Sequence, residues 1–314
     1  MAAIELDSVT KRYRDTIALH DLDLRVGESE IYGFLGPNGA GKSTTINILL
    51  DFVRPDEGNV RVLGYDAHRE SKQVRQHTGV LPEGADVYDR LSGRQHLEFA
   101  IDSMDGDEDP EAVAERVGIR DALGKKAGGY SKGMKQRLIL GTALVGEPDL
   151  LILDEPTTGL DPSGAREMRG IIREEANRGA AVFFSSHILG QVDAVCDRVG
   201  ILREGELVAE DTVDDLRNEI GTESTLVIDV DRVPKGLSDA LRALSNVSMV
   251  SIEDTTITVS CPDDEKTGVL TTIENEGATI NDFATEETSL EDLFVAYTSD
   301  GRDTNEQANP EVNP

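Results

Sequence analysis

The sequence is poor in cysteine, in long apolar runs and in basic residues. Its two cysteines, Cys196 and Cys261, lie in unrelated segments without metal-ligand spacing, so we expect neither a disulfide nor a metal site from them. No run of about 18 apolar residues could cross a bilayer, and the first residues lack the pattern of a signal peptide. These absences predict a cytoplasmic protein that is not itself inserted in a membrane.

The formal net charge is −30, from 61 acidic and 31 basic residues, and the isoelectric point is near 4.4. Nucleic acid is therefore not the expected partner, because binding to phosphates requires clustered lysine and arginine. The acidic residues are spread along the chain, and the apolar content is only 38%. This composition is typical of proteins from a very salty cytoplasm, where ions screen self-repulsion. An ordinary acidic protein is the alternative.

One stretch fits the phosphate-loop pattern G-x-x-x-x-G-K-[ST] at each fixed position: Gly36-Pro37-Asn38-Gly39-Ala40-Gly41-Lys42-Ser43-Thr44. An apolar strand over 30–35 precedes it and a helix over 44–50 follows, which is the context that the motif requires. Its glycines let successive N–H groups face one anion, and the helix dipole adds to the attraction. We expect Lys42 near the β- and γ-phosphates and the Ser43 hydroxyl on Mg²⁺.

Polar residues follow two other apolar strands. Asp154 and Glu155 end the run 149–155, and His187 ends the run 181–187. Such runs indicate buried parallel strands, whose carboxyl ends form the ligand-binding edge of an α/β sheet. We expect Asp154 to bind Mg²⁺, Glu155 to polarise an attacking water and His187 to contact a γ-phosphate oxygen. Tyr13, between two alternating N-terminal strands within 4–26, offers a flat face on which a nucleobase could stack.

These elements, in this order, resemble the nucleotide-binding subunit of ATP-binding-cassette transporters. Ser131-Lys132-Gly133-Met134-Lys135 resembles the signature of that family, and Asp161 matches the loop that crosses its dimer interface. His187 matches the switch histidine, and Tyr13 matches the aromatic residue that stacks on adenine. The resemblance covers residues 4 to about 220.

The resemblance implies an α/β fold of the P-loop NTPase class. We expect an ATPase domain over 1–220, with a mixed sheet, N-terminal antiparallel strands and a helical subdomain at about 84–145. Strands at 225–230 and 255–260 and helices at 237–244 and 266–274 predict a small α+β accessory domain over 221–300. It ends in a helix motif, Ser289 to Phe294, and a disordered acidic tail over 301–314 follows.

The resemblance also implies a mechanism, in which two copies of the chain sandwich two ATP molecules. The expected ATP-binding residues are Tyr13, Gly36, Asn38, Gly39, Ala40, Gly41, Lys42, Ser43 and Thr44. Ser131, Gly133 and Met134 would act from the partner copy, with Asp161 at the interface. Ser43, Glu83 and Asp154 would hold Mg²⁺, while Glu155 and His187 would be catalytic.

Three residues depart from the family pattern. The usual second residue of the signature, glycine, is Lys132, its closing glutamine is Met134, and the glutamine of the loop that couples to the permease is Glu83. These departures and the C-terminal part resemble the ABC-2-type exporters, which have separate permease chains. The resemblance therefore implies an exporter subunit that forms a homodimer on ATP binding and docks, through an integral-membrane permease, on the inner face of the cell membrane.

A soluble ATPase of the same class that acts on ribosomes or DNA is the alternative. Those on ribosomes usually carry two cassettes, and those on DNA are split by long coiled coils. Neither feature is present, and the acidity disfavours nucleic acid. A small-molecule P-loop kinase would not require the signature at 131–135 or the segment Gly159-Leu160-Asp161.

The acidic composition generates a prediction about salt. Raising the salt concentration from about 0.1 M to about 1 M shortens the Debye length from about 10 Å to about 3 Å, which screens repulsion between the acidic residues. We therefore expect the melting temperature, followed by circular dichroism, to rise over this range. A melting temperature that is indifferent to salt would contradict adaptation to a salty cytoplasm.

Overall fold

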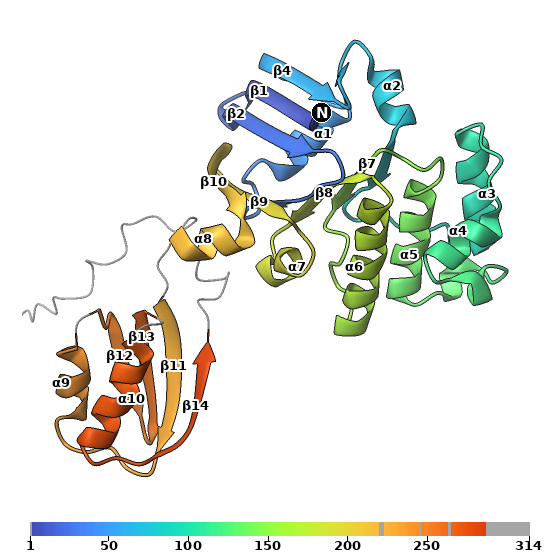
Figure 1. The fold of residues 1–314 in the computed structure, drawn as a ribbon. Coiled ribbons are helices and arrows are strands. Elements are labelled where there is room, and N and C mark those ends of the chain that lie inside the picture. Colours follow the sequence, from blue (N-terminus) through green and yellow to red (C-terminus); the bar gives the residue numbers. More distant parts are fainter. Residues whose placement is uncertain (1, 220–222, 245, 263–264, 287–314) are drawn as a thin grey trace, which may run out of the picture. The chain divides into compact units, whose positions relative to one another are not determined.

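The structure, a computed structural model, describes residues 2–219, 223–244, 246–262 and 265–286 (Figure 1). These residues form two compact units, one ending at Val213 and the other beginning at Asp214. The predicted domain boundary at 220 stays a prediction, because residues 220–222 are outside the described part. The predicted terminal helix motif and acidic tail also lie outside it. Within the described residues, no helix has both the length and the apolar character needed to cross a membrane.

The first unit is built on a six-stranded sheet whose inner strands are parallel and wholly apolar or nearly so. Its strands, in spatial order, are β10 (Glu206–Thr212), β9 (Arg198–Arg203), β3 (Ile31–Leu35), β8 (Ala181–Ser186), β7 (Leu150–Asp154) and β6 (Thr78–Leu81). Every residue of β3, β7 and β8 is buried, as expected of strands covered on both faces. Only β10 runs antiparallel to its neighbour. The three strands that precede the predicted functional residues are thus adjacent, with their carboxyl ends at one edge.

The N-terminal strands form a second, antiparallel sheet of the same unit. Its order is β2 (Thr16–Gly27), β1 (Ala2–Tyr13), β4 (Glu57–Val62) and β5 (Tyr65–Asp66). Alternate residues of β1 and β2 share one hydrophobic core with helix α1 (Lys42–Leu49) and with β3. The predicted antiparallel strands are therefore present, and β1 continues through Tyr13, so this tyrosine belongs to the strand and not to the turn.

Helices cover the six-stranded sheet or form the predicted helical region. They are α2 (Ser71–Gln76), α3 (Gly93–Ser103), α4 (Pro110–Arg116), α5 (Lys132–Ala143), α6 (Pro162–Asn177) and α7 (Leu189–Asp193), with short 3₁₀ turns at Arg120–Ala122 and Ala127–Gly129. Helix α8 (Val213–Glu219) begins at the last residue of this unit. Side chains cap the starts of several: Ser92 for α3, Asp109 for α4, Ser131 for α5 and Asp161 for α6. Helices α3, α4 and α5 pack on one another. The predicted fold class is confirmed.

The second unit is a four-stranded antiparallel sheet with two helices. The strands, in spatial order, are β12 (Met249–Glu253), β13 (Thr256–Pro262), β11 (Glu223–Val230) and β14 (Ile280–Glu286), and the helices are α9 (Leu237–Arg242) and α10 (Lys266–Asn275). Its core contains residues from both helices, including Leu241 and Ile273, and from β11 and β13. The two inner strands and both helices were predicted. The sequence analysis did not predict the edge strands β12 and β14.

A buried ion pair ties the helical region to the main sheet. The Glu175 carboxylate on α6 is 3% exposed and accepts two hydrogen bonds from the Arg116 guanidinium on α4, one of them 2.8 Å long from Nε. Arg178 also pairs with Glu175. These contacts raise the pKa of Arg116. Removing the carboxylate charge would leave the half-buried Arg116 without this compensation.

We predict that Glu175→Gln lowers the free energy of unfolding by about 3 kcal/mol, as is usual when one partner of a buried pair is lost. The matched change Glu174→Gln affects an exposed neighbour on the same helix and should shift it by less than about 0.5 kcal/mol. Urea unfolding followed by circular dichroism compares the two variants. Equal midpoints would show that the pair does not stabilise the fold.

Candidate functional site

The phosphate loop joins the end of β3 to the start of α1, as its pattern predicts. Gly39 and Gly41 have φ angles of 85° and 118°, which residues with a Cβ rarely adopt. A Cβ at Gly36 would also clash with the Leu202 carbonyl, and one at Gly41 would clash with the Ala18 carbonyl. No side chain caps α1, so its first N–H groups are available to an anion.

The ammonium of Lys42 lies inside this loop. It donates to the carbonyl oxygens of Gly36, at 2.6 Å, and Pro37, at 3.3 Å. Burial lowers the pKa of Lys42, while the charges of Glu155, Asp154 and Glu83 act in the opposite direction. Lys42 is therefore a buried cation that is hydrogen-bonded to backbone oxygens and faces acidic residues. Its positive charge attracts a further anion, and the negative charges of the acidic residues offset part of that attraction.

The phosphate loop and the acidic residues line one cavity of about 150 Å³. Its lining residues are Ala18, Asn38, Gly39, Gly41, Lys42, Ser43, Thr44, Glu83, Asp154 and Glu155. The structure thus brings together segments that are more than a hundred residues apart in the sequence. Three other predicted site residues do not line the cavity: Gly36 and Ala40 of the phosphate loop, and His187, which follows β8.

Asp154 ends β7 and is buried, 7% exposed. Its carboxylate accepts a hydrogen bond from the Ser185 hydroxyl on β8. Burial raises the pKa of Asp154, although the hydrogen bond from Ser185 acts in the opposite direction. Ser185 was missed by the sequence analysis. The available signal was a serine inside an otherwise apolar strand, next to the strand that carries the acids.

Glu155 follows in a strained backbone conformation with φ 52°, which turns the chain sharply at the end of β7. Its N–H group donates to the Ser185 carbonyl at 3.2 Å. One carboxylate oxygen lies 2.7 Å from His187 Nδ1, and the other accepts from the Thr158 hydroxyl at 2.9 Å. Both oxygens are thereby oriented by named partners at the edge of the cavity, and His187 reaches this group from the end of β8.

The oxygen donors of the cavity fit Mg²⁺. Ser43, Glu83 and Asp154 all line it, and hydroxyl and carboxylate oxygens are ligands that this hard cation prefers. Among the described residues, no three His, Cys, Asp or Glu side chains are grouped closely enough to hold a metal alone. Mg²⁺ typically uses one or two carboxylates and completes its shell with water and substrate phosphates. The donor set therefore fits a cation shared with a nucleotide.

The predicted signature lies outside this cavity. Ser131 caps α5 by accepting the N–H of Met134 at 3.3 Å, and Gly133 packs against Leu160. A Cβ at Gly159, where φ is 71°, would overlap the ammonium of Lys132. The signature and the loop 159–161 are therefore packed together within one chain, away from the phosphate loop.

Asp161 and Tyr13 also lie outside the lining of the cavity. Asp161 caps α6 by accepting the N–H of Gly164 at 2.7 Å. Tyr13 lies near the tip of the β1–β2 hairpin and is 44% exposed. The same hairpin borders the cavity through Ala18. One chain thus assembles the phosphate loop and the carboxylates, while the predicted signature residues, Asp161 and Tyr13 lie outside the lining of this cavity.

Comparison with known proteins agrees with this geometry. The family profile described as "ABC transporter" matches residues 19–158, and one described as "ATP-binding protein DrrA1-3-like, C-terminal domain" matches residues 212–298. The daunorubicin resistance ATP-binding protein DrrA3 of Streptomyces coeruleorubidus is 35% identical over 98% of this chain and 99% of its own. The bacitracin transport ATP-binding protein BcrA of Bacillus licheniformis is 39% identical over 68% of this chain and 71% of its own.

Solved structures match the first part of the chain. An ATP-binding subunit of an ABC transporter is 29% identical, with a TM-score of 0.63 over 69% of this chain and 93% of that one. CbiO1 of Clostridium perfringens, part of an ABC transporter complex, is 26% identical, with a TM-score of 0.64 over 70% and 92%. The chain therefore belongs to the ATP-binding subunits of ABC transporters, which are ATPases coupled to transport.

Proposed function

We propose that this chain is the ATP-hydrolysing subunit that powers a separate membrane permease, for export, from the inner face of the cell membrane. The observation that carries the proposal is the single cavity lined by the phosphate loop, Asp154 and Glu155. The direction of transport is proposed from relatives whose names describe daunorubicin resistance and bacitracin transport. The acidic surface is proposed to suit a salty cytoplasm and argues against a nucleic-acid partner.

ATP binding is proposed to use the loop backbone and Lys42 for the phosphates and Tyr13 for the base. The N–H groups at the start of α1 face the anion, and the ammonium of Lys42 moves its hydrogen bonds from loop carbonyls to phosphate oxygens. Bound Mg²⁺, held by Ser43, Asp154 and Glu83, would neutralise charge on the phosphates. Glu83 takes the place of the usual glutamine and supplies an additional negative charge at this site.

Hydrolysis is proposed to depend on Glu155 and His187. The carboxylate of Glu155 orients a water for in-line attack and accepts its proton. Thr158 and His187 fix the two carboxylate oxygens, so the base is held in one orientation before substrate arrives. The imidazole of His187, which follows β8, is also proposed to donate a hydrogen bond to the γ-phosphate.

Two copies of the chain are proposed to close on ATP. The Ser131 hydroxyl and the Gly133 N–H at the start of α5 lie outside their own chain's cavity, so they would complete the γ-phosphate site of a partner. Asp161, beside the signature, would lie at the interface. Binding of ATP favours the closed dimer because the nucleotide contacts both copies only in that state, and hydrolysis removes this preference.

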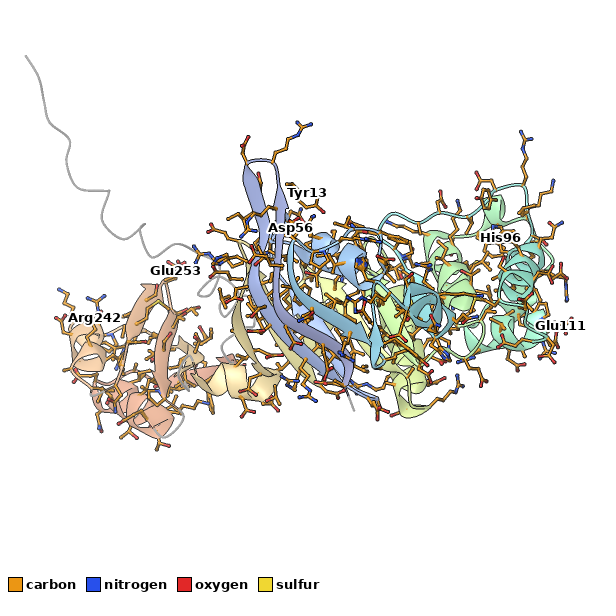
Figure 2. All side chains as sticks on the ribbon, turned by 90° about the horizontal axis from the view of Figure 1, so that it is seen from above. Tyr13, Asp56, His96, Glu111, Arg242 and Glu253 are labelled. Atoms are coloured by element: carbon orange, nitrogen blue, oxygen red, sulfur yellow. The ribbon has the colours of Figure 1, made fainter. Side chains whose placement is uncertain are left out.

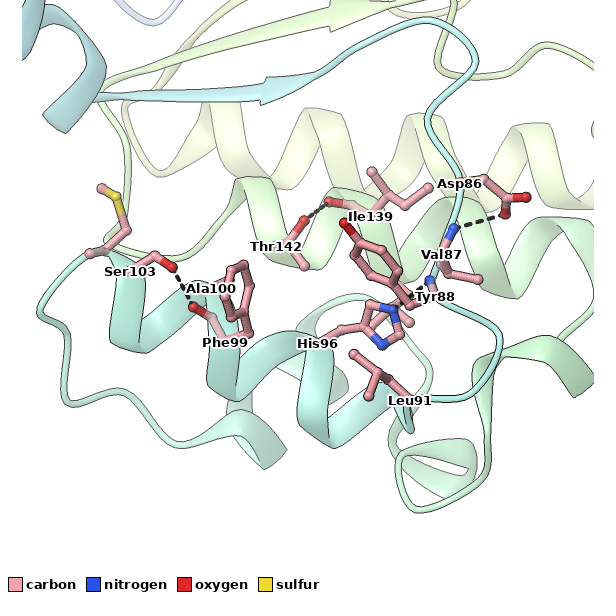
Figure 3. A pocket seen from close by; sticks show the side chains of 12 residues that line it. Asp86, Val87, Tyr88, Leu91, His96, Phe99, Ala100, Ser103, Ile139 and Thr142 are labelled. Atoms are coloured by element: carbon pink, nitrogen blue, oxygen red, sulfur yellow. Dashed lines mark hydrogen bonds between the residues drawn. The ribbon is translucent and has the colours of Figure 1, made fainter.

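A groove in the helical region is proposed to receive the permease. It has a volume of about 630 Å³ and lies between the segment that follows Glu83 and helices α3 and α5 (Figure 3). Two large aromatic side chains at this groove are strongly exposed, Tyr88 at 72% and Phe99 at 70%. The apolar lining and its continuity with the Glu83 segment fit an amphipathic helix of the permease.

Substitution of Glu155 tests the proposed hydrolysis. Glu155→Gln removes the proposed base and keeps the shape of the side chain, so Mg²⁺-dependent ATP hydrolysis should fall by at least about 100-fold. The variant should also form an ATP-bound dimer that persists, as measured by light scattering in high salt. The matched control Glu174→Gln should hydrolyse ATP like the wild type. If Glu155→Gln hydrolyses ATP at the wild-type rate and stays monomeric, Glu155 is not the catalytic carboxylate.

Substitution of an exposed aromatic residue in the groove tests the proposed docking of the permease. Phe99→Ser should weaken binding to the permease about tenfold or more, because exposed aromatic side chains commonly carry much of an interface's affinity. The measurement is co-purification with a tagged candidate permease that is expressed together with this chain. Phe52, 68% exposed but outside the groove, provides the control Phe52→Ser. Equal recovery of the permease with both variants would place the docking surface elsewhere.

A further inference from the structure

The proposed base-stacking residue, Tyr13, has a charged neighbour on the same face of its strand. Lys11 and Tyr13 are two residues apart on β1, so both side chains project from one side. The Lys11 ammonium lies 5.3 Å from the centroid of the Tyr13 ring, within the range of a cation–π interaction. The Lys11 side chain is only 13% exposed, which is low for a lysine.

Asp56, in the turn before β4, holds this lysine in place. Its carboxylate accepts the N–H of Arg12 at 2.7 Å and lies 3.4 Å from the Lys11 ammonium. The Asp56 N–H donates to the Thr10 carbonyl at 2.8 Å, so the residue is fixed through its backbone as well. The hydrogen bond from Arg12 lowers the pKa of Asp56 and keeps it charged. Figure 2 labels Tyr13 and Asp56 near the tip of the hairpin.

The ammonium therefore covers one face of the Tyr13 ring, and the ring remains 44% exposed. The hairpin that carries the ring also reaches the phosphate cavity. Ala18 on β2 lines that cavity, and its carbonyl lies so close to Gly41 that no Cβ fits there. The hairpin that carries the exposed Tyr13 ring therefore also packs against the phosphate loop, at Gly41.

We propose that Lys11, anchored by Asp56, is a positioning residue for the nucleobase. It fixes the Tyr13 ring from one side and leaves the other side for stacking. The proposal rests on the proposed function, in which Tyr13 stacks on adenine. A ring that is already held loses less freedom when the base binds, so the contact strengthens base binding without touching the phosphates.

A purely structural role would have a different signature. If Lys11 and Asp56 only fastened the hairpin to the turn before β4, their loss would lower stability and leave nucleotide affinity unchanged. If Lys11 attracted the nucleotide by its charge alone, affinity for any polyphosphate would fall. Positioning of the ring instead predicts a loss that is confined to ligands with a base.

The test compares ATP with inorganic triphosphate, which has the phosphates and no base. Lys11→Met keeps the apolar stem and removes the charge, and we expect it to weaken ATP binding by calorimetry about two- to fivefold, the range of an exposed cation–π contact. Affinity for inorganic triphosphate with Mg²⁺ should stay unchanged. In hydrolysis, KM should rise by the same factor with kcat unaltered. Asp56→Asn should act in the same direction.

Matched variants isolate the ring. Lys72→Met removes an exposed lysine on α2 and should leave both affinities at the wild-type value. In Tyr13→Leu, which removes the ring, the added change Lys11→Met should cost nothing further. An ATP affinity of Lys11→Met equal to that of Lys72→Met, or an equal loss with triphosphate, would overturn the proposal. Failure of the wild type to hydrolyse ATP would instead overturn the proposed function.

Discussion

The arrangement of the site depends on one buried cation, the ammonium of Lys42. A lysine buried in this way is tolerated because carbonyl oxygens of its own loop accept its hydrogen bonds and because acids stand opposite it. Two of those acids, Asp154 and Glu155, come from the end of β7, which lies beside β3 only through the intervening strand β8. The sheet order therefore does more than support the loop, because it also places acidic residues opposite the ammonium inside the loop.

The same sheet edge separates roles between neighbouring carboxylates. Asp154 continues the strand and is bound by Ser185, while Glu155 leaves the strand with φ 52° and is bound by His187 and Thr158. A change of backbone direction between two consecutive residues thus gives the two carboxylates different hydrogen-bond partners, although both are buried and line the same cavity. Ser185 links the two carboxylates, because its hydroxyl donates a hydrogen bond to Asp154 and its carbonyl accepts the N–H of Glu155.

The sequence was sufficient to predict features whose function requires a fixed local spacing of residues. It was insufficient to predict contacts between distant segments and exposed edge strands. The phosphate loop, the buried strands and Asp154 were found because their patterns are short and strict. Strand β14 was missed because its residues are exposed almost throughout and carry no alternation. Strand β12 does alternate, but over only five residues, which is a short signal. The contact of Lys11 with Asp56 was missed because it joins β1 to the turn before β4, and no local pattern specifies which residues of these two segments meet.

The signature shows how a departure from the family pattern can be accommodated. A lysine stands at position 132 in place of the usual glycine. It is the first residue of α5, where a positive charge interacts unfavourably with the helix dipole. The structure places this ammonium over Gly159, where the absence of a Cβ and a φ of 71° leave room for it. The loop that continues to Asp161 is thereby packed on the same helix start that carries Ser131. Lys132 thus departs from the usual sequence of the signature and adds a contact between the start of α5 and the loop at Gly159. In the proposed dimer, both of these elements face the same partner nucleotide.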